Sequence, residues 1–68
     1  MYGEVIHWLV ARGGEADYRS LLKYCTSLYG PEAKMHLEHT LGLNPAVFLV
    51  TPASTSKVNP KTKRVRLL

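Results

Sequence analysis

A chain of 68 residues has room for one small domain, and chains this short bury only about 60% of the surface that they expose when unfolded. Its composition, 46% hydrophobic and 21% charged, is typical of a globular protein, and no apolar run approaches the ~20 residues that a membrane helix needs. The net charge of +4 allows acidic partners such as nucleic acids. We therefore expect residues 1–68 to form a single domain without a membrane segment.

The N-terminal residues predict a first helix. Apolar side chains recur at helical spacing along one face, and Trp8 lies at the edge of that face. The apolar positions are Tyr2, Val5, Ile6, Leu9 and Val10. The pair Gly13-Gly14 then ends the helix, because glycine accepts the left-handed conformation that follows a helix C-terminus. Residues 14–17 could add a short strand at the edge of a sheet.

A second helix follows, with Asp17 as its N-cap and Gly30 at its end. Its apolar stripe consists of Tyr18, Leu21, Leu22, Cys25, Leu28 and Tyr29. Cys25 lies in the middle of this stripe. A catalytic cysteine needs an activating base and some exposure, so we interpret Cys25 as a small buried hydrophobic residue.

A third helix is predicted over residues 31–41, with Pro31 in its first turn and Gly42 closing it. We expect Ala33, Leu37 and Leu41 on its buried edge. The exposed residues are then Glu32, Met35, His36, Glu38 and His39. Three of these, Glu32, His36 and His39, share a narrow arc and could hold zinc, but no fourth ligand or supporting partner is evident, so we interpret them as an exposed polar face without metal.

The last stretch predicts a β-hairpin, because residues 48–52 and 63–68 are apolar runs joined by a polar connection. Val65, Leu67 and Lys63 alternate onto one face of the second strand, and Arg64 and Arg66 fall on the other. The apolar residues of the pair should join the helices in one core. We expect that core to contain Phe48, Val50, Val65, Leu67, Leu9, Leu21, Leu22 and Leu37.

Most of the positive charge lies in the same stretch. Residues 53–68 carry five basic side chains and no acidic one, whereas residues 1–52 carry four basic and five acidic ones. A basic block of this kind is typical of a contact with phosphates, with an acidic protein or with a membrane surface. The alternative is a solvated loop that lysines keep soluble.

Three short helices followed by a hairpin predict an α+β fold of the winged-helix type, with the third helix in the recognition position and the hairpin as the wing. With these elements in place, the chain resembles the N-terminal winged-helix domain of the CCCH zinc-finger antiviral protein family and its mono-ADP-ribosyltransferase relatives. The resemblance rests on Gly3-Glu4-Val5, Ala11-Arg12-Gly13-Gly14, Leu21-Leu22, Phe48-Leu49-Val50 and Val65-Arg66-Leu67. The LOTUS domain of germline RNA regulators is similar through the same double glycine, leucine pair and hairpin.

In the first of these families the winged helix precedes CCCH fingers and binds RNA together with them. This chain has one cysteine and no finger, so the resemblance implies a module whose partner domains lie outside it. We therefore expect contact with the backbone of RNA or DNA, and of the two RNA is the expected ligand. The candidate contact residues are Lys57, Lys61, Lys63, Arg64 and Arg66 on the wing, with Arg19 and Lys23 on the second helix.

Reading of base sequence is not expected, because Glu32 and Glu38 on the third helix would face phosphates, and Lys34 is the single cation there. The rival hypothesis is a protein-interaction module that docks another protein through helix 31–41, with Met35 as a contact, or through the edge strand. No Gly-rich phosphate loop or nucleophile elbow is present. We expect neither an enzyme nor a cofactor nor a small-molecule substrate.

Two further observations bear on location. Residues 1–5 lack the basic region of a signal peptide, and His7 and Arg12 interrupt the apolar stretch that follows. The single cysteine cannot form an internal disulfide, in agreement with a reducing compartment. We expect an intracellular protein, in the cytoplasm rather than the nucleus.

Overall fold

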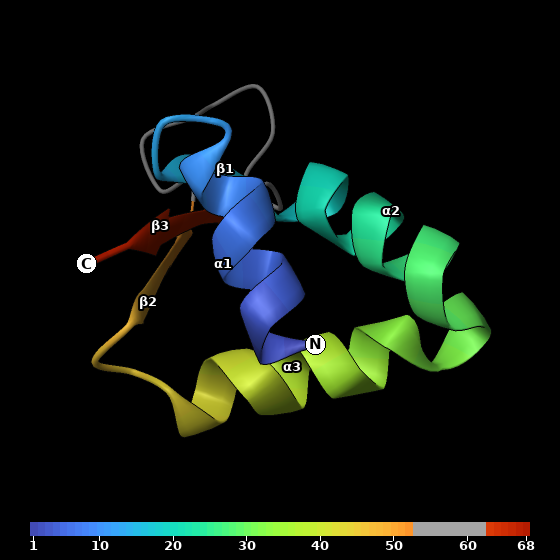
Figure 1. The fold of residues 1–68 in the computed structure, drawn as a ribbon. Coiled ribbons are helices and arrows are strands. Elements are labelled where there is room, and N and C mark those ends of the chain that lie inside the picture. Colours follow the sequence, from blue (N-terminus) through green and yellow to red (C-terminus); the bar gives the residue numbers. More distant parts are fainter. Residues whose placement is uncertain (53–62) are drawn as a thin grey trace.

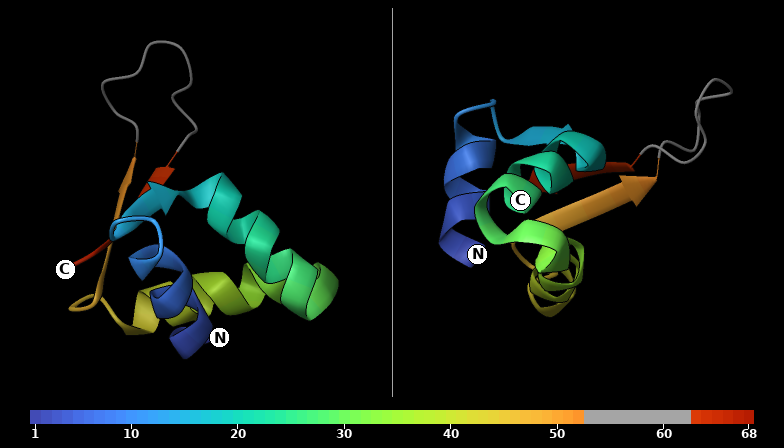
Figure 2. Two further views of the ribbon diagram at one scale, coloured as in Figure 1. Left: turned by 45° about the horizontal axis from the view of Figure 1, so that its top comes forward. Right: turned by 90° about the vertical axis from the view of Figure 1, so that its right-hand side faces the viewer.

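The computed structural model describes residues 1–52 and 63–68 of the chain (Figure 1). Its elements in chain order are α1 (Tyr2–Val10), β1 (Glu15–Asp17), α2 (Tyr18–Tyr29), the 3-10 turn η1 (Gly30–Glu32), α3 (Ala33–Leu43), β2 (Phe48–Pro52) and β3 (Lys63–Leu67). The predicted α+β class is confirmed. Figures 1 and 2 show the sheet at the end of the molecule away from the turn between α2 and α3.

The three strands form one antiparallel sheet in the order β1-β3-β2. Val50 lies opposite Val65 in the β2–β3 pair, and Ala16 lies opposite Val65 in the β1–β3 pair. The expected pairing of the last two strands is therefore confirmed, and so is the short edge strand, which begins at Glu15. Strand β3 is central, so its side chains are positioned by neighbours on both sides.

The sequence places most helix ends correctly. Gly13 and Gly14 have φ of 82° and 93°, and Gly30 has φ of 78°, the left-handed values that favour glycine. The end of α3 differs from the prediction, because the helix continues through Gly42 to Leu43. A glycine inside a helix costs only ~1 kcal/mol, and the helix ends at Leu43, with Asn44 as its C-cap directly before Pro45.

Two further details of the helices differ from the sequence prediction. Pro31 lies in η1 and not in the third α-helix. In α1, Trp8 is buried and Val10 is 62% exposed, so the buried face is rotated toward Trp8. The cause is α2, whose Tyr24 stacks on Trp8 with ring centroids 5.5 Å apart.

One hydrophobic core joins the helices to the inner face of the sheet. Its buried residues are Val5, Trp8, Leu9, Ala16, Leu21, Cys25, Ala33, Leu37, Leu41, Phe48 and Val65. Leu22 and Leu67 are only partly buried against this core, and Val50 is 38% exposed, less buried than the strand alternation predicted. Val50 lies on the edge strand, where no neighbour in the described part of the chain covers its open side. None of the described helices has the length and apolar character that a membrane crossing requires.

Candidate nucleic-acid interface

The structure distributes the predicted phosphate contacts over more than one surface. Lys57 and Lys61 lie outside the described residues. Arg19 and Lys23 are exposed on α2, where a spacing of four residues places them on neighbouring turns of one face. These two cations are therefore available to a ligand that approaches α2 from solvent.

The three cations of β3 lie on opposite faces of the sheet, as the alternation predicted. Lys63 is on the core side, and its Nζ is 5.3 Å from the centroid of the Tyr18 ring. Arg64 and Arg66 are exposed on the outer side, where they lie opposite Thr51 and Leu49 of β2. Lys63 thus belongs to a different surface from the two arginines.

The outer face of the sheet carries a carboxylate that the sequence analysis did not assign to the site. Arg64 donates through Nη2 to Glu15 Oε1 at 2.9 Å, and both side chains are about half exposed. Arg66 lies directly opposite Glu15 in the strand register. This face is therefore mixed in charge, since Glu15 offsets part of the arginine pair.

The first turn of α2 lies beside this face because Asp17 belongs to both. Asp17 is opposite Arg64 in the β1–β3 pair, and as the N-cap of α2 it accepts a hydrogen bond from the Ser20 amide at 3.1 Å. Partial burial acts to raise the pKa of Asp17, but the hydrogen bonds from Ser20 and the backbone and the charge of Arg64 outweigh it, so the pKa lies below its usual value. Asp17 remains a carboxylate at neutral pH.

A second basic surface lies between the end of α1 and α2, in a hollow of about 400 Å³. It is lined by Trp8, Arg12, Ser20, Lys23, Tyr24 and Ser27. The lining contains two cations and three hydroxyl groups, and none of its residues is acidic. Asp17 is nevertheless adjacent, because the Ser20 hydroxyl donates to it at 2.9 Å. The arrangement is suited to an anion that accepts hydrogen bonds from several directions.

Arg12 is the residue of this hollow that sequence reasoning missed. Its guanidinium carbon is 3.8 Å from the centroid of the Trp8 ring, and it also donates to the Trp8 carbonyl at 3.5 Å. The cation–π contact fixes the guanidinium at the mouth of the hollow while leaving the residue exposed. The signal was the spacing of four residues from Trp8 to Arg12, which lets a side chain in the turn after α1 reach back over the last turn of the helix.

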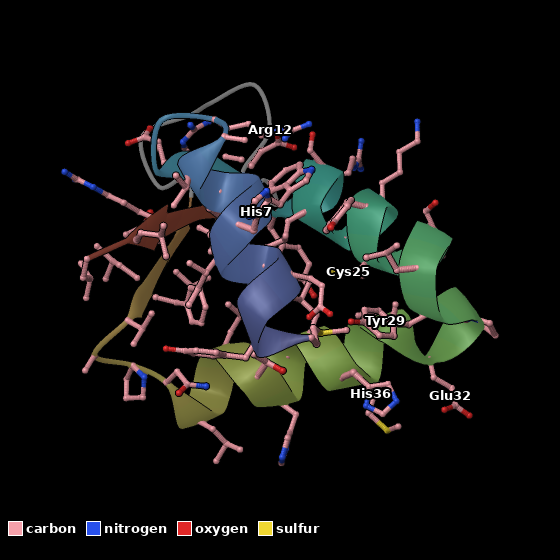
Figure 3. The ribbon with its side chains drawn as sticks, in the orientation of Figure 1. His7, Arg12, Cys25, Tyr29, Glu32 and His36 are labelled. Carbon is pink, nitrogen blue, oxygen red and sulfur yellow. The ribbon has the colours of Figure 1, made fainter. Side chains whose placement is uncertain are left out.

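The polar face of α3 is exposed as predicted, and it lies away from the hollow. Figure 3 shows Glu32 and His36 at the far end of the molecule from Arg12. The His36 ring nitrogen Nε2 is 3.6 Å from Glu32 Oε2, whereas no group of three potential metal ligands comes together in the described residues. Met35 is 62% exposed on the same helix. The possible zinc site is therefore reduced to a surface pair of one carboxylate and one imidazole.

Cys25 is fully buried in the interior between the helices (Figure 3). Burial is the main cause that raises the pKa of its thiol. A protonated, inaccessible thiol is a poor nucleophile. Its position agrees with the interpretation of Cys25 as part of the apolar stripe of α2.

Comparison with known proteins finds no family model that matches the chain, and no curated protein or solved structure that matches it.

Proposed function

We propose that the chain is a winged-helix module that binds the phosphate backbone of nucleic acid, with RNA rather than DNA as the first choice of ligand. In this assignment α3 occupies the position of the recognition helix, and β2 and β3 form the wing. The order of three helices and a terminal strand pair, with a short strand after the first helix, supports the assignment. The wing contributes Arg64 and Arg66, and the sequence adds Lys57 and Lys61 between its strands.

The hollow between α1 and α2 is the observation that carries this proposal. Arg12 and Lys23 supply two positive charges at its rim, and Ser27 adds a hydroxyl that can donate to a phosphate oxygen. Arg19 extends the same charge along α2. A phosphate seated here meets two cations without displacing an ion pair, whereas one on the outer sheet face competes with Glu15 for Arg64.

The acidic side chains on and next to α3 favour contact with phosphates over contact with base edges. Glu38 is exposed on this helix and Glu32 is exposed at its N-cap, and both would lie against the backbone of a duplex if α3 entered the major groove. Their repulsion disfavours the usual docking of a recognition helix. The module should accordingly bind with little sequence preference and with strong salt dependence.

The test is a titration of a fluorescein-labelled oligouridine at several salt concentrations. Each phosphate neutralised on a single strand contributes about −0.7 to the log–log salt slope, so three contacts give roughly −2. We expect Lys23→Gln to weaken binding and to reduce the magnitude of the slope by about 0.7. Lys34→Gln, the same change on the exposed surface of α3, should leave both quantities unchanged.

Two outcomes would contradict the proposal. Equal losses for Lys23→Gln and Lys34→Gln would show that the hollow is not the phosphate site. No binding even at low salt would remove nucleic acid altogether and leave the protein-interaction module, for which the exposed Met35 on α3 is the contact to alter first.

A further inference from the structure

A groove of about 450 Å³ lies between α3 and β2, and it shares no lining residue with the hollow between α1 and α2. Its apolar lining includes Leu41, Phe48 and Val50. Leu41 and Phe48 are nearly inaccessible, at 7% and 3%, so they form the floor, and Val50 at 38% forms the rim. The groove therefore offers an apolar floor with an exposed rim at the edge of the sheet.

Strand β2 is the outer strand on this side, because the sheet order is β1-β3-β2. Hydrogen-bonded and non-bonded pairs alternate along an antiparallel ladder. Leu68 N donates to Val47 O at 2.9 Å, so the pair formed by Leu49 and Arg66 is bonded, and the pair formed by Val50 and Val65 is not. The amide and carbonyl of Val50 consequently point away from β3, toward the open edge.

The other amides of β2 are not available at this edge. Phe48 N donates to Asn44 O at 3.0 Å, and Pro52 has no N–H group. The amides of Leu49 and Thr51 face β3 by the same alternation. Among the described residues, the Val50 N–H is thus the available donor of β2 at the open edge, and the carbonyls of Phe48, Val50 and Pro52 point the same way by the alternation. The N–H and carbonyl of Val50 form the pair that bonds one residue of an added antiparallel strand.

Polar groups of the groove also lack partners within residues 1–52 and 63–68. The hydroxyl of Tyr18 is buried and makes no hydrogen bond there. Burial, with a smaller contribution from the charge of Glu38, raises the pKa of Tyr18, so the hydroxyl keeps its proton and remains a donor. Lys63 lies over the Tyr18 ring and has no carboxylate within ion-pair distance in the described part. Glu38 also lines the groove but forms no ion pair with Lys63 among the described residues, so the Tyr18 hydroxyl and the Lys63 ammonium remain available to an acidic side chain.

We propose that an extended acidic peptide of a partner protein adds to β2 as a fourth, antiparallel strand. The peptide residue opposite Val50 points to the same side of the sheet as Val50 and places an apolar side chain in the groove. Because the added strand is antiparallel, the residue two positions before it lies opposite Pro52, on the side of Lys63. A carboxylate at that position meets the Lys63 ammonium and accepts from the Tyr18 hydroxyl.

A second copy of the chain fits this edge less well. A two-fold pairing of β2 with itself around Val50 would place Val50 of the copy opposite Val50, and Phe48 of the copy would then lie opposite Pro52. Phe48 is buried in the core of its own copy, so this pairing could fill the groove with a valine but would supply no carboxylate from β2 to Lys63. A strand with an apolar residue opposite Val50 and an acid two positions earlier both fills the groove and pairs with Lys63.

The probe is an acetylated seven-residue peptide of threonines with glutamate at the second and leucine at the fourth position. Titration into ¹⁵N-labelled protein should shift the Val50 and Gly42 amides and saturate below about 1 mM. The same peptide with an N-methyl group on the leucine cannot donate to the Val50 carbonyl. It should bind about tenfold more weakly, because one hydrogen bond at an edge is lost and an acceptor is left unpaired.

Two protein variants complete the test. Val50→Pro removes the outward N–H, a change that edge strands tolerate when the N–H faces solvent, so the fold should persist while peptide binding falls about tenfold. Lys63→Glu should weaken binding of the glutamate peptide, and a peptide with lysine in place of glutamate should restore it. Circular dichroism of both variants checks that the domain is folded.

Three results would overturn the proposal: equal affinity for the parent and N-methylated peptides, failure of the lysine peptide to rescue Lys63→Glu, or no shift at Val50 up to about 1 mM. Concentration-dependent dimerisation that shifts Val50 without peptide would assign the edge to a second copy instead. Val50→Pro should leave oligouridine binding unchanged, so a negative result for peptide binding can be told apart from a negative result for the phosphate site.

Discussion

Arg64 and Glu15 form an ion pair across two neighbouring strands, with Nη2 and Oε1 2.9 Å apart. The pair joins an arginine of the predicted interface to an acid that lies 49 residues away in the sequence. It therefore lowers the positive potential of the outer sheet face and at the same time holds the Arg64 guanidinium in place.

Replacing Glu15 by Gln should strengthen nucleic-acid binding with little effect on stability. A negative charge about 6 Å from a phosphate in water repels it by about 0.7 kcal/mol, so its removal should raise the affinity about threefold at low salt. The exposed ion pair itself stabilises the fold by less than about 1 kcal/mol. Oligouridine titration and urea unfolding measure the two effects. Glu32→Gln, at the far end of the molecule, should change neither, and an equal gain for both variants would contradict a local effect.

The N-cap of α2 should be visible in the free energy of unfolding. Asp17 accepts from the Ser20 amide, and loss of a capping side chain costs ~1 kcal/mol, so Asp17→Ala should lose about that amount in urea unfolding at pH 7. Asp17→Asn keeps an acceptor at the cap and should lose less. If both variants were as stable as the natural chain, the cap would contribute nothing to stability.

The same residue predicts a dependence of stability on pH. The pKa of Asp17 is lower in the folded protein than in the unfolded chain, so the folded state binds its proton less readily. The contribution of the Asp17 carboxylate to the free energy of unfolding is full above the unfolded pKa of about 3.9. It is lost as the pH falls through the pKa of the folded state. The natural chain should therefore lose its advantage over Asp17→Asn between about pH 5 and pH 2, as urea unfolding at several pH values would show. A constant difference over this range would contradict the assignment.

The two neighbouring leucines of α2 should differ in their contribution to the core. Leu21 is fully buried, so Leu21→Ala should cost about 2–5 kcal/mol of unfolding free energy. Leu22 is only partly buried, and Leu22→Ala should cost less than about 2 kcal/mol, contrary to its predicted place in the core. Urea unfolding of both variants gives the comparison. Equal losses would mean that Leu22 is packed as tightly as Leu21.

Cys25 should react only when the domain opens. Its side chain is inaccessible and burial raises its thiol pKa, so alkylation by iodoacetamide should be at least about a hundredfold slower in the folded protein than in urea. Mass spectrometry of timed samples measures the rate. Free cysteine in each buffer provides the reference, and similar rates in the two conditions would contradict the burial.

Features that depend on local chemistry could be predicted from the sequence. Gly13, Gly30 and Asp17 mark helix ends through their own backbone or side-chain preferences, and the alternation of Val65 with Arg64 sets the faces of β3. Gly42 was a wrong helix end, because the packing of Leu41 and the exit at Asn44 outweigh the small cost of a glycine in a helix.

The candidate site was harder to predict, because its geometry depends on contacts between elements. The position of Arg12 depends on α2, because Tyr24 stacks on Trp8 and the guanidinium of Arg12 lies over the same Trp8 ring. The pairing of Arg64 with Glu15 required that β1 lie next to β3. The open edge at Val50 likewise follows from the strand order and not from any local pattern.

The stack of Arg12, Trp8 and Tyr24 has an optical consequence. Trp8 is the single tryptophan of the chain, with a cation on its ring and a tyrosine 5.5 Å away. Indole emission depends on nearby charge, so a ligand that draws the guanidinium from the ring should change the intensity and wavelength of the emitted light. The natural chain thus carries its own fluorescent reporter beside the hollow, and occupancy there can be followed without attaching a dye to the protein.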